Sequence, residues 1–422
     1  MTFSAGPTVH DVQRVRVWTE STFATDGTGT LSNFKDVPMK EGSMGTFKLT
    51  QETIDPGSIV QTRWNYRQEI LGKKHCELSF TMPLAPTGTE AGNSTAAVAG
   101  ALGVILKAIM GGEQLGTGTR AKSGWTSTSG TVTTGAGANL LAGSSLGWVN
   151  SSSQLEAREI KQRSTDTLTT KLAFSGTPAN TDVLYASATY YLTGSPDTSL
   201  QFIIEGPELQ DRWLMLGAQG SMTLSLPIGA DNALPEVTFT FKGANWLLGN
   251  ACATDLTASN LAVGSVTNFS PIPGYAGRLM VQTNGTTTYT GATQDVNAVV
   301  FEPQIKYEPV SSPSGTNSVL RWIASRASGP ALTGNFQSYF ADYTRFNWKT
   351  NRTSLAVWYQ IGTLKGQTIL IAAPTVQVTD VQRIKVGSIA GEQVNFKARN
   401  DGDTTEVTAS DLGQSPFRIH FL

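Results

Sequence analysis

The sequence predicts a mainly β protein in which one fold, a pair of β-sheets (sandwich or barrel) with a flanking α-helix, occurs twice. Three observations predict it. Glycine is frequent, with 43 among 422 residues, and charged residues make up only 15%, which is typical of many short strands joined by turns. Several segments alternate apolar and polar residues, the period of a half-buried strand. The two halves also repeat one order of predicted elements.

The repeated order is a hairpin, a helix and closing strands, with a tryptophan in each first hairpin. In the first half these are residues 57–64 with 70–82, 96–110 and 236–243. In the second half they are residues 317–322 with 331–342, 353–361 and 392–399. The segment 353–361 is interpreted as a helix, with a strand as the alternative.

Turn chemistry and composition divide the chain into five parts. Residues 1–44 are turn-rich and are expected to form an N-terminal arm. The first copy covers 45–113 and 196–249, and the Gly/Ser/Thr-rich stretch 114–195 between them is expected to be a small inserted β domain, an outward decoration. Residues 250–296 are expected to be a connector loop, and the second copy covers 297–422.

Within the first copy, residues 76–82 predict a strand with one apolar and one polar face. Cys76, Leu78, Phe80 and Met82 share one face, whereas Glu77, Ser79 and Thr81 share the other. The helix 96–110 follows, after a capping sequence at 93–95 and before two glycines at 111–112. It is apolar nearly all round, so we expect it to be buried on several sides.

The second copy is expected to open with a single strand over residues 297–310. Its apolar face would carry Phe301, Ile305 and Tyr307. Its polar face would carry the residues of alternate positions: Glu302, Gln304, Lys306 and Glu308.

Composition and motifs exclude several kinds of function. The chain has 31 Lys and Arg against 32 Asp and Glu, so it lacks the basic excess of a nucleic-acid binder. Three histidines in separate segments predict no metal site, and no catalytic or cofactor-binding motif is found. We therefore expect no catalytic residue, no cofactor and no enzyme activity. A pair of carboxylates for glycoside hydrolysis stays possible, since the two groups need only lie close in space and need no sequence motif.

No apolar run is long enough for a membrane span, and residues 1–6 lack the pattern of a secretion signal. The two cysteines, Cys76 and Cys252, fit synthesis in a reducing cytoplasm.

The strand and turn patterns resemble the tail tube proteins of long-tailed (siphophage-like) bacteriophages. In the second half the resemblance lies in 353–364, 366–378 and 417–421. In the first half it lies in 72–80, 217–227 and 237–242. It covers most of the chain except the arm and the insertion; the extra length and the loop at 250–290 depart from the family pattern.

The resemblance implies a structural virion protein, made in the host cytoplasm, whose stacked rings form a channel for DNA ejection. Family members typically close a ring with six subunits, so a duplicated chain implies homotrimer rings with pseudo-sixfold symmetry; a homohexamer is the alternative. The implied partners are further copies of the chain, a tape measure protein inside the channel, and the tail terminator and distal tail proteins. DNA would only pass through, without specific binding.

Residues facing the channel are then expected to be polar to acidic, because phosphate contacts would hold the DNA. The candidates for this lumen-facing surface are Glu77, Ser79, Thr81, Glu302, Gln304 and Glu308. Other β-rich virion proteins (distal tail, tube terminator, decoration) are the nearest rivals, followed by a β-fold carbohydrate-binding or hydrolytic protein.

Overall fold

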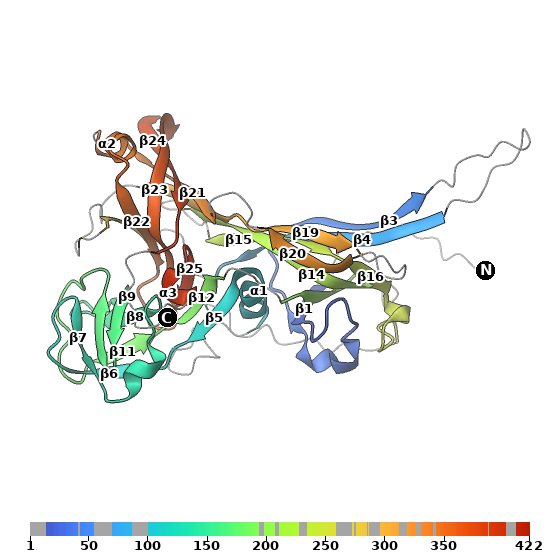
Figure 1. Cartoon of the computed structure of the whole chain (residues 1–422), viewed down its shortest axis with the longest axis horizontal. Coiled ribbons are helices and arrows are strands. Elements are labelled where there is room, and N and C mark those ends of the chain that lie inside the picture. Colours follow the sequence, from blue (N-terminus) through green and yellow to red (C-terminus); the bar gives the residue numbers. More distant parts are fainter. Residues whose placement is uncertain are drawn as a thin grey trace, which may run out of the picture.

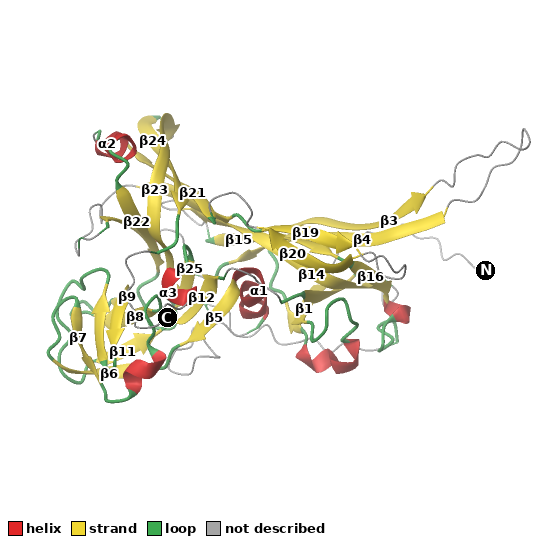
Figure 2. Ribbon diagram, in the orientation of Figure 1, coloured by secondary structure: helices red, strands yellow, loops and turns green. Residues whose placement is uncertain are grey.

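The computed structural model is dominated by strands, as the sequence predicts (Figure 2). It describes residues 14–40, 43–54, 70–86, 100–193, 198–206, 211–227, 234–258, 272–273, 276–284, 286, 296–311, 319–325, 331–340, 343–386, 388–401 and 411–422. None of the described helices is long and apolar enough to cross a bilayer. The predicted hairpin segment 57–64 lies outside the described residues.

The first copy is built on a long strand, β14 (Arg212–Pro227), which pairs with two different sets of strands along its length. Its first part pairs with β13 (Leu200–Glu205) and β16 (Asn245–Leu248), and β13 also pairs with β1 (Arg14–Thr19). Its second part pairs with β15 (Glu236–Gly243), which continues to β4 (Ile70–Pro83) and then β3 (Met44–Ile54). The short β2 (Lys35–Asp36) pairs with β1.

The second copy repeats these pairings around β23 (Ile369–Val386). Its first part pairs with β22 (Ser354–Ile361) and β25 (Arg418–Phe421), and β22 also pairs with β17 (Gly277–Thr283). Its second part pairs with β24 (Ile389–Ala398), which continues to β21 (Leu332–Tyr339) and β18 (Val296–Pro303). Seven strands therefore correspond one to one: β1, β3, β4, β13, β14, β15 and β16 with β17, β18, β21, β22, β23, β24 and β25.

The corresponding strands correct two expected boundaries. Residues 14–36 are not an arm, because β1 is the first strand of the first copy. Residues 277–283 are not connector loop, because β17 is the first strand of the second copy. Each pairs with a strand distant in the sequence, a relation that local turn composition cannot reveal.

The helices are partly as predicted. Helix α1 (Ala101–Met110) is almost entirely buried and ends at Gly111, whose φ of 84° is the left-handed conformation that glycine favours; residues 93–99 lie outside the described residues. The helix expected over 353–361 is wrong: this segment is β22, and the helix of the second copy is α2 (Thr344–Thr350) just before it. A strand buried on both faces is apolar throughout, so its sequence lacks the alternation of a half-buried strand.

The stretch expected to be an inserted β domain contains a closed barrel of six strands. These are β6 (Thr119–Ser123), β7 (Ser129–Val132), β8 (Ser145–Val149), β9 (Leu155–Ser164), β10 (Thr167–Thr170) and β11 (Val183–Ala186). The barrel has its own core, which includes Leu146, Ile160 and Leu184. Strands β5 (Gly111–Leu115) and β12 (Ala188–Leu192) lead into and out of it and pair with each other.

Although the barrel is inserted in the first copy, it packs on the second (Figure 1). Leu155, Ala157 and Leu172 of the barrel segment join one apolar cluster with Trp358, Leu370 and other residues of the second copy. Strand β12 also pairs with β25. The tertiary structure thus ties the insertion to the half of the chain in which it is not inserted.

A buried group of charges lies at the same contact. Arg418 of β25 donates to Glu159 of the barrel at 2.8 Å and to Asp401 at 2.9 Å, and all three side chains are fully buried. Lys171 is also paired with Asp401, and the Trp358 indole donates to Glu159 at 2.8 Å. Buried charges need such partners, because taking them out of water is costly.

The remaining short elements are the 3-10 helices η1 (Thr28–Asn33), η2 (Ala136–Asn139) and η3 (Gly249–Ala251), helix α3 (Asp411–Gln414), and a ribbon of two strands. The ribbon consists of β19 (Lys306–Ser311) and β20 (Val319–Ser325), which form a sheet of their own.

Candidate functional site

The largest candidate surface is one face of the sheet that joins the two copies. Strand β14 of the first copy pairs directly with β18 of the second, with Leu224 opposite Phe301. The strand order is therefore β3, β4, β15, β14, β18, β21, β24 and β23, in one continuous sheet. The first four strands and the last four have the same order of corresponding strands.

One face of this sheet is apolar across both copies. Phe80, Phe239 and Phe241 lie on it in the first copy, and Phe301 and Phe396 in the second. All five are at most 1% exposed and belong to the largest core cluster. Because successive side chains of a strand point to opposite faces, this core fixes which residues the other face presents.

The opposite face, which we call the polar face, is rich in hydroxyl and amide side chains. In the order of the strands it carries Glu77, Ser79, Thr81, Thr238, Thr240, Lys242, Ser221, Thr223, Ser225, Glu302, Thr333, Asn335, Gln337, Gln393, Asn395 and Lys397. All of them are half-buried or exposed. Neighbouring side chains bond to each other, as between Thr81 and Thr238 at 2.9 Å.

The charges on the polar face are of both signs. Glu77 lies opposite Lys242 on one side and Lys48 on the other, and Glu302 is separated from Lys397 by Thr333. The surface is therefore polar with mixed charge, which is the polar end of the range, polar to acidic, expected for a channel.

The structure brings together most, but not all, of the predicted surface residues. Glu77, Ser79, Thr81 and Glu302 lie on the polar face, and Gln304 reaches it by donating to the Thr333 hydroxyl at 2.9 Å. The prediction of a single strand over 297–310 is wrong. The segment forms two strands, because the chain leaves the sheet after Pro303 and begins β19 at Lys306. Glu308 therefore lies on the ribbon, which is not part of the sheet that carries the polar face. Whether these residues face a channel stays a prediction.

Sequence reasoning missed most of the polar face. Thr238, Thr240 and Lys242 alternate with buried apolar residues along β15, and the alternation continues in β21 and β24. The signal was therefore present in each strand. What joins the strands into one surface is the order in which they pair, which local period does not contain.

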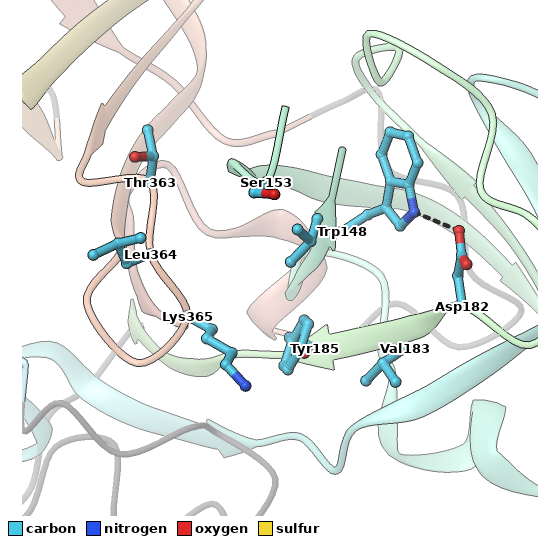
Figure 3. Close-up of a pocket in the computed structure, with 9 residues that line it drawn as sticks. Trp148, Ser153, Asp182, Val183, Tyr185, Thr363, Leu364 and Lys365 are labelled. Atoms are coloured by element: carbon cyan, nitrogen blue, oxygen red, sulfur yellow. Dashed lines mark hydrogen bonds between the residues drawn. The ribbon is translucent and has the colours of Figure 1, made fainter. Parts of the chain in front are cut away.

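A separate pocket lies where the barrel meets the loop after β22 (Figure 3). It encloses about 440 Å³ and is lined by Trp148, Val149, Ser153, Asp182, Val183, Tyr185, Thr363, Leu364 and Lys365. The Trp148 indole donates to Asp182 at 2.9 Å, and that carboxylate also accepts the Ala179 N–H. Asp182 is the one carboxylate among these lining residues, so the pocket lacks the carboxylate pair of a glycosidase.

The described part of the chain contains neither a metal-binding group of side chains nor a reactive thiol. No group of three or more His, Cys, Asp or Glu side chains is placed there to hold a metal ion. Burial raises the pKa of the Cys76 and Cys252 thiols to about 12. Both therefore stay protonated at neutral pH and are poor nucleophiles.

No protein-family model matches this chain, and no curated protein matches it.

Proposed function

We propose that this chain is the tube subunit of a bacteriophage tail, with three chains closing each ring and stacked rings enclosing the channel for DNA. The observation that supports it best is the joint between the two copies. Strand β14 of one copy pairs with β18 of the next, and the polar face continues across the joint, where β18 contributes Glu302 together with the apolar Ala298 and the half-buried Val300. A ring needs this joint repeated between chains.

The outer edges of the joined sheet support the same proposal. Among the described residues, no strand pairs with β3 on the side away from β4, or with β23 beyond Gln377 on the side away from β24. Strand β23 corresponds to β14, and β3 corresponds to β18. The same joint can therefore form between β23 of one chain and β3 of the next, and unpaired edges favour such pairing.

In this arrangement the apolar face is covered by each chain's own core, and the polar face lines the channel. Hydroxyl and amide groups with balanced charges offer DNA few fixed phosphate contacts, so the DNA can slide. The tape measure protein would fill the channel during assembly, and the terminator and distal tail proteins would cap the tube, as the family resemblance implies. The proposed location is the virion tail.

The test uses two matched pairs of cysteines. Because Leu224 lies opposite Phe301, the adjacent Thr223 and Glu302 are neighbours within one chain; the corresponding positions across the proposed joint are Gln382 and Lys48. We expect T223C/E302C to form a disulfide within the chain, and K48C/Q382C to link chains into covalent rings. Cross-strand pairs have the spacing that a disulfide needs, and the protonated native thiols react slowly.

Non-reducing gels and electron micrographs of the purified protein give the result. Covalent species that end at a closed trimer, in rings that stack into hollow tubes, are the expected outcome. Six chains per ring would contradict the trimer. A soluble monomer with only the internal disulfide would contradict the tube, and glycan binding or cleavage by that monomer would favour the carbohydrate-binding or hydrolytic alternative.

A further inference from the structure

The last strands of the two copies, β16 and β25, differ in how well they are buried and paired. Strands β16 and β25 correspond, since each pairs with the first part of the long strand of its copy. All residues of β25 are buried, and β12 pairs with its other edge. The residues of β16 are half-buried or exposed, and no strand among the described residues pairs with its other edge.

Residues of β16 pack on both of its faces, and the strand differs from β25 in having an open edge. Leu247 packs on a small apolar cluster that includes Phe34 and Leu256, and Trp246 packs on the main core. Leu248 is nevertheless 45% exposed, one of few large apolar side chains so exposed in the described chain. The indole nitrogen of Trp246 is buried without a hydrogen-bond partner. The backbone N–H of Trp246 donates to the side-chain oxygen of Asn245 at 2.8 Å and not to a neighbouring strand. These are the features of a strand edge that lacks a neighbour.

A strand that lacks a neighbour exists elsewhere in the same chain. The ribbon of β19 and β20 pairs with no third strand in the described residues, and a ribbon of two strands is only marginally stable alone. Strand β19 contains Pro309, which has no backbone N–H to donate to a further strand. Strand β20 reads Val-Leu-Arg-Trp-Ile-Ala-Ser over 319–325, an apolar strand with no proline and one charge, so it is the edge suited to pairing.

We propose that β20 of one chain adds to the open edge of β16 in a second chain, in the way β12 adds to β25 within the chain. This contact deepens the proposed tube and rests on it, because it would join successive rings, whereas the β23–β3 joint closes each ring. One pairing then satisfies both unpaired edges, covers Leu248 and gives strand partners to the outer backbone groups of β16.

The first test places a lysine at the edge. Leu248 is exposed, so L248K should fold like the native chain, but a charge on an edge strand opposes pairing. We expect single closed rings in place of tubes, with at least a tenfold loss of tube length in electron micrographs. The control is L364K, which places the same charge on another exposed leucine, 58% exposed, away from any strand edge; it should form tubes of normal length. Full-length tubes from L248K would overturn the proposal.

The second test identifies the occupant. With benzoylphenylalanine at position 248 of the full chain, irradiation of the assembled protein should yield an adduct to the peptide containing residues 319–325 of another chain. An adduct within the same chain, or to a different segment, would overturn the proposal. If the native chain forms no rings, the proposed tube fails. An intermolecular adduct to 319–325 would then still establish the contact, and its absence would refute it.

Discussion

Arg418 joins the second copy to the barrel through an ion pair that is buried in the contact between them. Its guanidinium satisfies Glu159 and Asp401 at once, and all three groups are inaccessible to water. Although burial alone would raise the pKa of Glu159, the adjacent Arg418, Lys171 and His420 lower it far below its ordinary value. The pKa of Asp401 is lowered against burial by the charges of Arg418 and Lys171.

Replacing Arg418 by methionine should therefore destabilise the protein strongly. The change leaves two buried carboxylates short of a cation, which typically costs about 3–5 kcal/mol. The measurement is the free energy of unfolding in denaturant. The control is K107M, which breaks the ion pair of Lys107 with Glu113; because the Lys107 side chain is 51% exposed, we expect a loss below about 1 kcal/mol. Equal losses in the two variants would contradict a special role for Arg418.

The same group of side chains predicts how stability changes with pH. Burial lowers the pKa of His420, so the folded protein keeps this ring neutral while the unfolded chain takes up a proton below about pH 6.5. Glu159 and Asp401 also have lowered pKa values, so the unfolded chain binds more protons at these groups below about pH 4.5. Stability is lost as pH falls in both ranges.

We expect these three groups to lower the denaturant midpoint as pH falls from 7 to 4, whereas Glu20, whose pKa burial raises to about 7, acts in the opposite direction between pH 7 and pH 4.5. In H420Q the midpoint between pH 7 and pH 5 should therefore fall less, or rise more, than in the native chain, because the titrating ring is gone. The neutral His420 ring lies beside the Thr189 hydroxyl and the Glu159 carboxylate, so glutamine keeps polar atoms near both. An unchanged slope between pH 7 and pH 5 in H420Q would show that another group titrates.

The long strands β14 and β23 are the elements that connect the two sets of paired strands within each copy. Each pairs with one set of strands along its first part and another along its second. In β14 the transition lies at Gly217, which has a φ of 61° and whose N–H donates to Glu20 at 2.7 Å. A side chain at this position would meet Ala244 at 2.8 Å and Phe23 at 3.0 Å.

Gly217→Ala should therefore be more destabilising than an alanine at a similar backbone conformation in open space. Gly124 has a φ of 66°, and no atom lies within 4 Å of the position that a Cβ would take there. G124A therefore meets only the left-handed backbone cost of about 1–2 kcal/mol. We expect G217A to lose this amount plus the cost of the collision, as measured by denaturant unfolding. Similar losses in both variants would show that the neighbours of Gly217 move aside freely.

The whole chain is asymmetric although its fold is duplicated. Strands β13 and β14 of the first copy are covered by segments of that copy, including Phe34 and Leu256, whereas the corresponding strands β22 and β23 of the second copy are covered by the barrel. In a ring of three chains, three barrels would alternate with three positions that carry no barrel. The outside of such a tube would have threefold symmetry, while its channel would be close to sixfold.

Removing the barrel should therefore damage the second copy. The ends of the insertion are adjacent, since the Gly116 N–H donates to the Ser187 carbonyl at 3.1 Å, so a short turn can replace residues 117–186. The deletion uncovers Trp358, Leu370 and Leu422 and leaves Arg418 without Glu159. We expect a lower melting temperature and binding of a hydrophobic dye; a native melting temperature would mean that the barrel is a removable decoration.

The sequence alone determined the β class, the two faces of β4 and the buried helix α1, because these depend on periods read within a few residues. Cys76, Leu78 and Phe80 must lie together on a strand, and Glu77 and Ser79 must lie opposite. Only the tertiary structure decided that β1 and β17 open the two copies, that Glu308 leaves the sheet carrying Glu302, and that the barrel packs on the second copy. These depend on pairing between distant segments, which is selected by the fit of whole sheets and cores and leaves no local period in the sequence.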